Sequence, residues 1–200
     1  MKRLILAQIL IFLALFLPGR EVFALTKTDE YVRTANYFLK AGTDIKQSDY
    51  VNLAKFDLLV LPQEAGVYNK DLFSYLRQNN PDIIILAYTP TRSINLAFLD
   101  DGAGLRRQLL NNTDSSWYLY DQWGGVVSTW PNTESFNITS GWNSYLPQFV
   151  KNNILSTELW DGVFYDEVDA DVSYKNNGNI DLNRDGIKDN ASTADDAWRR

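Results

Sequence analysis

Four apolar runs of strand length, spaced so that a helix fits between them, constrain most what this chain can fold into. The runs occupy residues 34–39, 56–61, 82–88 and 161–166. They are predominantly apolar rather than strictly alternating, which is typical of strands buried on both faces of a parallel sheet. The sequence therefore predicts four parallel β-strands.

Helical patterns lie between these runs. Residues 70–79 place three apolar side chains on one helix face, and Pro81 stops this helix before the third run. Similar patterns predict a helix over residues 94–110, interrupted by two glycines, and another over residues 142–155. Strand and helix are therefore expected to alternate along the chain.

This alternation predicts an α/β fold with right-handed crossovers, either an open doubly wound sheet or a barrel. A doubly wound nucleotide-binding sheet would need a glycine-rich turn after the first strand, and none follows Leu39. We therefore expect a (β/α)8 TIM-type barrel. Such a barrel needs roughly 200 to 250 residues and eight strands, so we expect this chain to be its N-terminal half, with about four βα units.

Residues 1–24 have the pattern of a secretory signal peptide. Basic residues precede an apolar run over residues 4–17, and Ala24 ends a V-x-A cleavage site. The run lies near the lower length limit for a membrane span, so an uncleaved membrane anchor is the alternative. In either case residues 25–200, the expected partial barrel, would be secreted or would lie at the cell surface.

The net charge limits the classes of partner. It is −6 at pH 7, and removing the signal peptide, with its three basic residues and one acidic residue, would make it −8. Nucleic acids and anionic lipids need Lys and Arg to neutralise phosphate, so neither is expected as a partner. We expect no membrane contact beyond the signal segment, and an acidic surface suits a neutral or cationic ligand and calcium.

The chain contains no histidine and no cysteine. Ser-His-Asp hydrolysis, Cys-His hydrolysis and His-ligated zinc are therefore excluded within these residues, and disulfides cannot stabilise an exported chain. With 45% apolar residues, a packed core is expected instead. Carboxylates are what remains for acid–base chemistry.

The acidic segment after the fourth run holds the candidate catalytic residues, Asp166 and Glu167. Catalytic groups of a barrel enzyme lie at the carboxyl ends of its strands, which is the position of Asp166. Alternation along a regular strand would point Glu167 to the other face, so Asp166 is the first choice for the pocket. Asp166 would act as nucleophile or base. Glu167 or Asp169 would orient Asp166 or contact sugar hydroxyls. Alternatively, these acids cap the next helix or bind calcium.

A polar and aromatic segment, residues 111–141, interrupts the alternation of strand and helix. A loop of this length in a compact domain is usually functional. Together with Asp169, five of its side chains are candidates for substrate binding: Trp117, Tyr120, Asp121, Trp123 and Trp130. The alternative is a β-hairpin with its turn at Gly124 and Gly125, whose aromatic side chains only pack on the barrel.

Residues 181–189 resemble the first part of an EF-hand loop, with oxygen ligands at positions 1, 3, 5 and 9, a glycine at position 6 and a backbone carbonyl at position 7. The predicted ligands of a structural Ca²⁺ ion are Asp181, Asn183, Asp185, Ile187 through its carbonyl, and Asp189. Position 12 is Ser192 rather than a bidentate Glu, so Asp195 or Asp196 is expected to supply the missing carboxylate. A solvated loop of Asx turns is the alternative.

Several motifs together resemble a known group of proteins. They are W-Y-L-Y-D at 117–121, Trp130-Pro131, N-I-T at 137–139, L-W-D-G-V-F-Y-D at 159–166 and I-D-L-N-R-D-G at 180–186. They resemble the hypothetical glycosyl hydrolase group, which is similar to the endo-α-1,4-polygalactosaminidase barrels of glycoside hydrolase family 114. The resemblance covers nearly all of residues 25–200. It implies a TIM-type barrel that acts on polysaccharide, or descends from enzymes that do, with Asp166 at the catalytic strand end.

The leading hypothesis is a secreted glycoside hydrolase that cleaves polysaccharide or oligosaccharide with paired carboxylates, one of which is expected to lie beyond this chain. The alternative is a non-catalytic, calcium-stabilised carbohydrate-binding or cell-surface module in which Trp123 and Trp130 stack on sugar rings. A third hypothesis is a calcium-stabilised structural surface protein without a ligand. The sequence does not indicate the oligomeric state.

Overall fold

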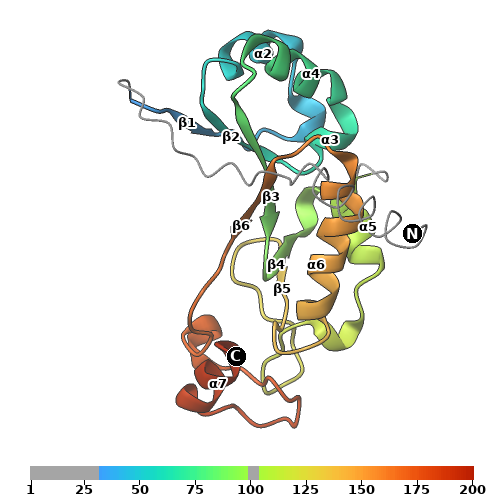
Figure 1. Ribbon diagram of the computed structural model, residues 1–200. Helices are drawn as coiled ribbons and strands as arrows, with labels where there is room; N and C mark the ends of the chain where they lie inside the picture. The colour runs from blue at the N-terminus through green and yellow to red at the C-terminus, as the bar shows by residue number, and fades with distance from the viewer. Residues whose placement is uncertain (1–31, 99–103) are drawn as a thin grey trace, which may run out of the picture. The chain divides into compact units, whose positions relative to one another are not determined.

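A four-stranded parallel sheet organises the chain. In order across the sheet, the strands are β1 (Ala35–Tyr37), β2 (Leu58–Pro62), β3 (Ile84–Pro90) and β6 (Gly162–Asp166). They run side by side in the computed structural model (Figure 1), and all three neighbouring pairs are parallel. The four predicted strands and the mixed α/β class are therefore confirmed.

The structure describes residues 32–98 and 104–200. All of them except Val32 belong to one unit, Arg33–Arg200. The predicted signal peptide, residues 1–24, lies outside the described residues. Within the two described stretches, no helix is long and apolar enough to cross a membrane.

Burial on both faces, expected of all four strands, is confirmed for β2 but is wrong for β1 and β6, whose residues are half-buried or exposed. β2 is buried from Leu59 to Pro62, on both of its faces, and β3 alternates between buried and half-buried residues. Leu59, Leu61, Ile85 and Ala87 are fully buried in the main core. Burial on both faces is the reason that the sequence of β2 lacks a polar alternation.

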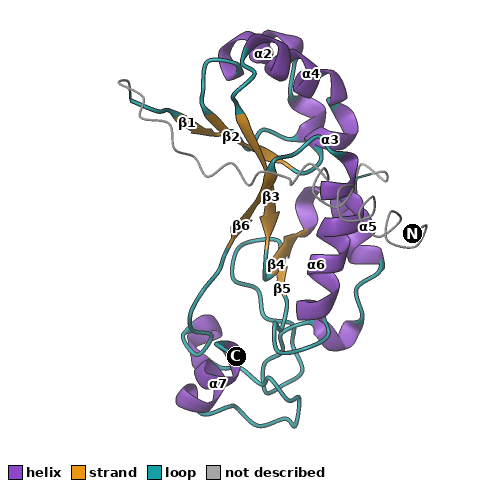
Figure 2. Ribbon diagram, in the orientation of Figure 1, coloured by secondary structure: helices purple, strands orange, loops and turns teal. Residues whose placement is uncertain are grey.

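Helices occupy the segments between and after the strands (Figure 2). They are α2 (Gln47–Leu53), α3 (Ala65–Tyr68), α4 (Lys70–Asn79), α5 (Leu105–Asn111), α6 (Trp142–Asn153) and α7 (Ala191–Trp198), with 3₁₀ turns at Gly42–Asp44, Leu96–Phe98, Ser115–Trp117, Leu155–Thr157 and Lys175–Gly178. The helix predicted over residues 70–79 is confirmed as α4, whose three apolar side chains are buried. The helix predicted from residue 142 is confirmed as α6.

The helix predicted over residues 94–110 is wrong over residues 94–98, and its residues 99–103 lie outside the described residues. Ser93–Asn95 forms strand β4, which pairs antiparallel with β5 (Thr133–Ser135). Helix α5 begins only at Leu105. The apolar spacing of this segment is compatible with a helix or a strand. Pairing with β5, which is distant in the sequence, makes it a strand, and this strand buries Ile94 in the main core.

The hairpin alternative for residues 111–141 agrees with the structure near the centre of this segment. Tyr120 and Val126 form an antiparallel bridge, and the backbone N–H of Val127 donates to the carbonyl of Leu119 (2.8 Å). The side chains of Leu119 and Val127 are buried in a second, smaller apolar cluster together with residues of α7. The hairpin therefore anchors the C-terminal helix.

Candidate active site

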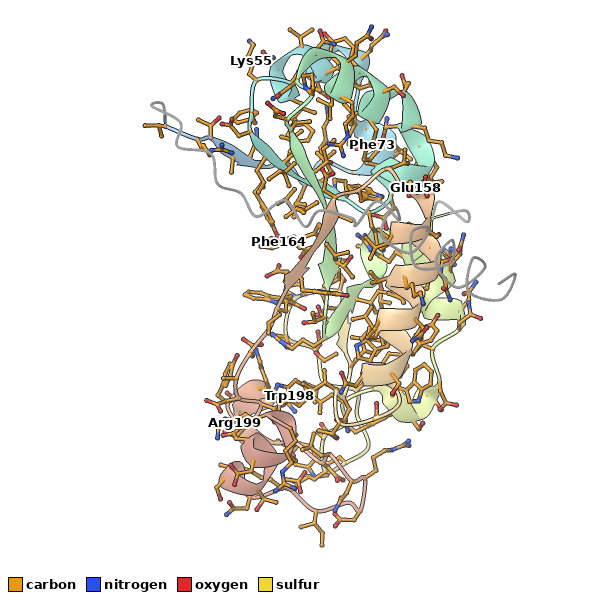
Figure 3. The ribbon with its side chains drawn as sticks, in the orientation of Figure 1. Lys55, Phe73, Glu158, Phe164, Trp198 and Arg199 are labelled. Carbon is orange, nitrogen blue, oxygen red and sulfur yellow. The ribbon has the colours of Figure 1, made fainter. Side chains whose placement is uncertain are left out.

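A cavity of about 1270 Å³ lies at the carboxyl ends of the four sheet strands. At or just after the ends of β1, β2, β3 and β6, its lining includes Leu39, Ala41, Pro62, Glu64, Tyr88, Pro90, Asp166 and Glu167. Parallel strands end on the same edge of a sheet, so residues far apart along the chain meet there. Phe164, labelled in Figure 3, marks β6 two residues before the acidic segment.

Asp166, the last residue of β6, is held by three hydrogen bonds. Its Oδ2 atom accepts from the hydroxyls of Tyr88 (2.8 Å) and Tyr37 (3.5 Å), and its Oδ1 atom accepts from the backbone N–H of Glu167 (2.7 Å). Burial, and then the hydrogen bond to Asp166, raise the pKa of Tyr88 far above its ordinary value. Tyr88 therefore remains a hydrogen-bond donor at neutral pH.

Glu167 lines the same cavity as Asp166, although strand alternation predicts opposite faces for two adjacent residues. The reason is that β6 ends at Asp166 and the backbone of Glu167 is left-handed, with φ 61°. The Oε2 atom of Glu167 accepts a hydrogen bond from the Ser93 hydroxyl (2.5 Å), and Oε1 accepts one from the indole N–H of Trp130 (2.9 Å). The structure thus brings together three residues that the sequence predicted for the site: Asp166, Glu167 and Trp130.

Thr91, in the turn after β3, supports the backbone of both acids. Its N–H (3.0 Å) and its hydroxyl (2.7 Å) donate to the carbonyl of Asp166, and the hydroxyl also lies 3.1 Å from the carbonyl of Glu167. The carbonyl of Thr91 accepts a hydrogen bond from the indole N–H of Trp142 (2.6 Å). A buried core tryptophan therefore supports the segment that carries the acids.

Asp169, which is half-buried, takes part in an ionic cluster with two buried cations. Its carboxylate pairs with Arg92 and, at 3.0 Å, with Lys175, and all three side chains line the cavity. Arg92 is 3% exposed and Lys175 is 7% exposed. Burial raises the pKa of Asp169, but the hydrogen bond from Lys175 and the charge of Arg92 outweigh it, so this pKa lies below its ordinary value. The predicted substrate-binding carboxylate is thus shared by two buried cations.

Asp169→Asn is expected to lower the free energy of unfolding by about 2 kcal/mol at neutral pH, within the range for a hydrogen bond to a charged group. The pKa of Asp169 is lower in the folded protein than in the unfolded chain. Its contribution is therefore fully present above about pH 4 and is lost as the pH falls through the folded pKa. Urea unfolding measured from neutral pH down to about pH 3 should show the difference between variant and wild type shrinking in acid. A difference that does not change with pH contradicts the prediction.

Four of the residues predicted to bind substrate lie outside the lining of this cavity: Trp117, Tyr120, Asp121 and Trp123. Trp117 packs against the main core. Tyr120 and Asp121 make hydrogen bonds with backbone groups of their own loop. Trp123 is 79% exposed. A role of these four in binding sugar stays a prediction, whereas Trp130 and Asp169 line the cavity together with the acids.

Sequence reasoning missed several residues that line the cavity or bond to its acids: Tyr37, Glu64, Tyr88, Arg92, Ser93 and Lys175. Glu64 is buried two residues after β2, where it lies 3.7 Å from Arg106 and accepts a hydrogen bond from the amide of Gln63 (3.4 Å). Its sequence signal resembled that of Asp166, because both are acids at the end of an apolar run. Local sequence carried no comparable signal for Ser93 or Lys175.

The calcium-type loop has the turns expected from its sequence. The buried Asp181 accepts hydrogen bonds from the backbone N–H groups of Asp185 (3.2 Å) and Gly186 (2.8 Å), and Asp189 accepts from that of Leu182 (2.7 Å). These bonds are typical of the Asx-turn alternative, which needs no metal. In the part of the chain that the structure describes, no three acidic side chains converge in a metal-binding arrangement. Calcium binding therefore stays a prediction.

The acids expected to complete the calcium site have partners elsewhere. Asp195 accepts hydrogen bonds from the backbone N–H groups of Val172 (2.9 Å) and Ser173 (2.8 Å), and from the Ser173 hydroxyl (2.7 Å). Asp196 lies 3.4 Å from Arg199 within α7. A calcium ion at 181–189 would therefore be held by the loop itself.

Calcium at about 5 mM is expected to stabilise the protein by about 1–2 kcal/mol, since extracellular calcium modules have Kd values of roughly 0.1–1 mM. Asp185→Ala should abolish this gain because it removes a predicted ligand. Titration calorimetry and thermal unfolding measure the two effects, with magnesium at the same concentration as the control. The prediction is wrong if calcium produces neither heat nor a change in melting temperature in the wild-type protein.

The match to a family profile agrees with the motifs in the sequence. The profile of hypothetical glycosyl hydrolase family 15 matches residues 77–200, the stretch that contains Asp166. Among solved structures, the glycoside hydrolase domain of PelA from Pseudomonas aeruginosa is similar, with 16% identity and a TM-score of 0.43. That match covers 68% of this chain and 45% of the PelA chain, so this chain spans less than half of that structure. No curated protein matches the chain. The profile match covers more than half of the residues, and the chain belongs to hypothetical glycosyl hydrolase family 15.

Proposed function

We propose that the protein is a secreted glycoside hydrolase that cleaves polysaccharide, with Asp166 as a catalytic carboxylate. The observation that carries the proposal is the position of Asp166 and Glu167, which line one large cavity at the carboxyl end of a parallel sheet. In barrel enzymes the active site lies at this end of the strands. Membership of a hypothetical glycosyl hydrolase family supports hydrolysis of a glycosidic bond as the proposed reaction class.

Hydrolysis of a glycosidic bond ordinarily uses two carboxyl groups, one as acid and one as nucleophile or base. Asp166 is the proposed nucleophile or base, because Tyr37, Tyr88 and a backbone N–H orient both of its oxygens. Glu167 is the proposed partner within this chain. Glu64 lines the same cavity and is the other acid to test.

We propose that the sheet is half of a (β/α)8 barrel. Its strands follow one another across the sheet in the order in which they occur along the chain, apart from the β4–β5 pair. A doubly wound sheet reverses this order at a switch point, whereas a barrel does not. Within the described residues, β1 and β6 are the outer strands of the sheet, so each offers one backbone edge with which a further barrel strand could pair.

Secretion is proposed from the signal-peptide pattern of residues 1–24. A carbohydrate is the proposed partner, and Trp130 at the rim of the acidic site offers an exposed aromatic face of the kind that sugars pack on. Trp123, which is more exposed, is proposed as a second aromatic side chain on which a sugar could pack.

The test is an assay of reducing ends released from a panel of neutral, amino-substituted and acidic polysaccharides by the purified protein. Release from one class supports the proposal and identifies the substrate class. Binding to a polysaccharide without release would favour the carbohydrate-binding module instead. The absence of both binding and release would exclude both functions for the polymers in the panel.

A further inference from the structure

We propose that Ser93 and Trp130 are positioning residues that hold the carboxylate of Glu167 in its working orientation. The proposal rests on the proposed function, since it assigns a catalytic role to Glu167. Each oxygen of this carboxylate accepts one side-chain hydrogen bond, Oε2 from the Ser93 hydroxyl at 2.5 Å and Oε1 from the Trp130 indole N–H at 2.9 Å. Two donors on different oxygens determine both the position and the rotation of a carboxylate.

The backbone of Glu167 shows that this position is maintained against strain. Its φ of 61° is left-handed, a region that residues other than glycine rarely adopt. The hydroxyl of Thr91 donates to the carbonyl of Asp166 (2.7 Å) and lies 3.1 Å from the carbonyl of Glu167, which supports the unusual turn. The backbone and both carboxylate oxygens of Glu167 are therefore held by residues from outside β6.

Both donors belong to one structural feature, the β4–β5 pair and the turn that precedes β5. Ser93 is the first residue of β4, and its register partner is Ser135 on β5. Trp130 is joined to the start of β5 by Thr133, whose hydroxyl accepts from the Trp130 N–H (3.0 Å) and also bonds to the Trp130 carbonyl (2.7 Å). The register of this small antiparallel pair thus sets the separation of the two donors.

This geometry changes the role of Trp130 from the one that its sequence suggests. An aromatic residue in a polar loop predicts a surface for stacking on sugar, and Trp130 is indeed 58% exposed. Its N–H, however, is used by Glu167. Trp130 would therefore act mainly through the carboxylate that it orients, because preorganised groups need no rearrangement at the moment of reaction.

Kinetics of the full chain separate positioning from stacking. Trp130→Phe keeps an aromatic ring and loses the N–H, and we expect kcat to fall about 10- to 100-fold with KM nearly unchanged. Ser93→Ala should have a similar effect on kcat. Ser93→Thr, which retains a hydroxyl, should keep most of the wild-type activity. Ser156→Ala, an exposed serine on the turn after α6, is the matched control and should leave kcat unchanged. A loss confined to KM in Trp130→Phe would show a stacking surface and overturn the proposal.

A second measurement does not depend on activity. The chain has six tryptophans, so a ¹H–¹⁵N spectrum should contain six indole signals, and the loss of one in Trp130→Phe assigns it. Glu167→Gln replaces a charged acceptor by a weaker neutral one and should move the Trp130 indole proton upfield, whereas Asp171→Asn should not. An unmoved signal overturns the positioning role. A moved signal in a protein that hydrolyses no polymer would uphold the Trp130–Glu167 contact and reject the proposed function alone.

Discussion

Asp166→Asn is expected to lower kcat for polysaccharide hydrolysis by about 10²- to 10⁴-fold, the range for losing a group that transfers protons in the transition state. The neutral amide cannot serve as base or nucleophile. It keeps an oxygen that can accept the hydrogen bond of Tyr88, so the surrounding structure should survive. Initial rates of reducing-end release on the best substrate of the wild-type protein measure the effect.

Asp171→Asn is the matched control for Asp166→Asn. Asp171 lies five residues further along the chain, outside the lining of the cavity, and pairs with Arg199. Its variant should keep wild-type kcat, and both variants should keep nearly the wild-type melting temperature. Equal activity of Asp166→Asn and wild type would remove Asp166 from the mechanism.

Trp142→Ala is expected to lower the free energy of unfolding by about 3–5 kcal/mol, as typical for truncating a large buried aromatic residue. Trp142 is 1% exposed and stacks on Phe136 with ring centroids 3.7 Å apart. Truncation would leave a cavity and would remove the hydrogen bond to the carbonyl of Thr91. Because the free energy of unfolding of a domain is only about 5–15 kcal/mol, this one substitution would remove a large part of the stability of the protein. Urea unfolding followed by circular dichroism measures it.

Trp123→Ala is the control for this prediction, because Trp123 is largely exposed and its loss should change stability by no more than about 0.5 kcal/mol. Trp142→Phe separates the two contributions of Trp142, since it keeps ring packing and removes the N–H bonded to Thr91. A destabilisation below about 1 kcal/mol in Trp142→Ala would show that the site relaxes around the missing ring, contrary to our expectation.

The strands were predictable because each is a local run of apolar residues. Burial on both faces explains the apolar run of β2, and Asp166 could be placed at a strand end because it closes the fourth run. The position of Glu167 could not be predicted by the same rule. Alternation holds only inside a regular strand, and the left-handed backbone that follows Asp166 turns the next side chain back into the cavity.

The segment from residue 91 to residue 141 shows a different limit of local patterns. The apolar spacing around Ile94 fits a helix, yet pairing with β5 makes this stretch a strand. The aromatic side chains of the long loop look alike in the sequence, but Trp117 packs against the core, Trp123 is exposed and Trp130 bonds to Glu167. Contacts with residues distant in the sequence determine which of these three environments each tryptophan has.

The sequence by itself determined the α/β class, the four strands, the family and the acidic strand end, because periodicity and short motifs are properties of neighbouring residues. Only the tertiary structure decided which groups meet Asp166. Its tyrosine partners, Tyr37 and Tyr88, lie 129 and 78 residues away along the chain. They reach the same carboxylate because parallel strands bring their carboxyl ends to one edge, a juxtaposition that no local pattern encodes.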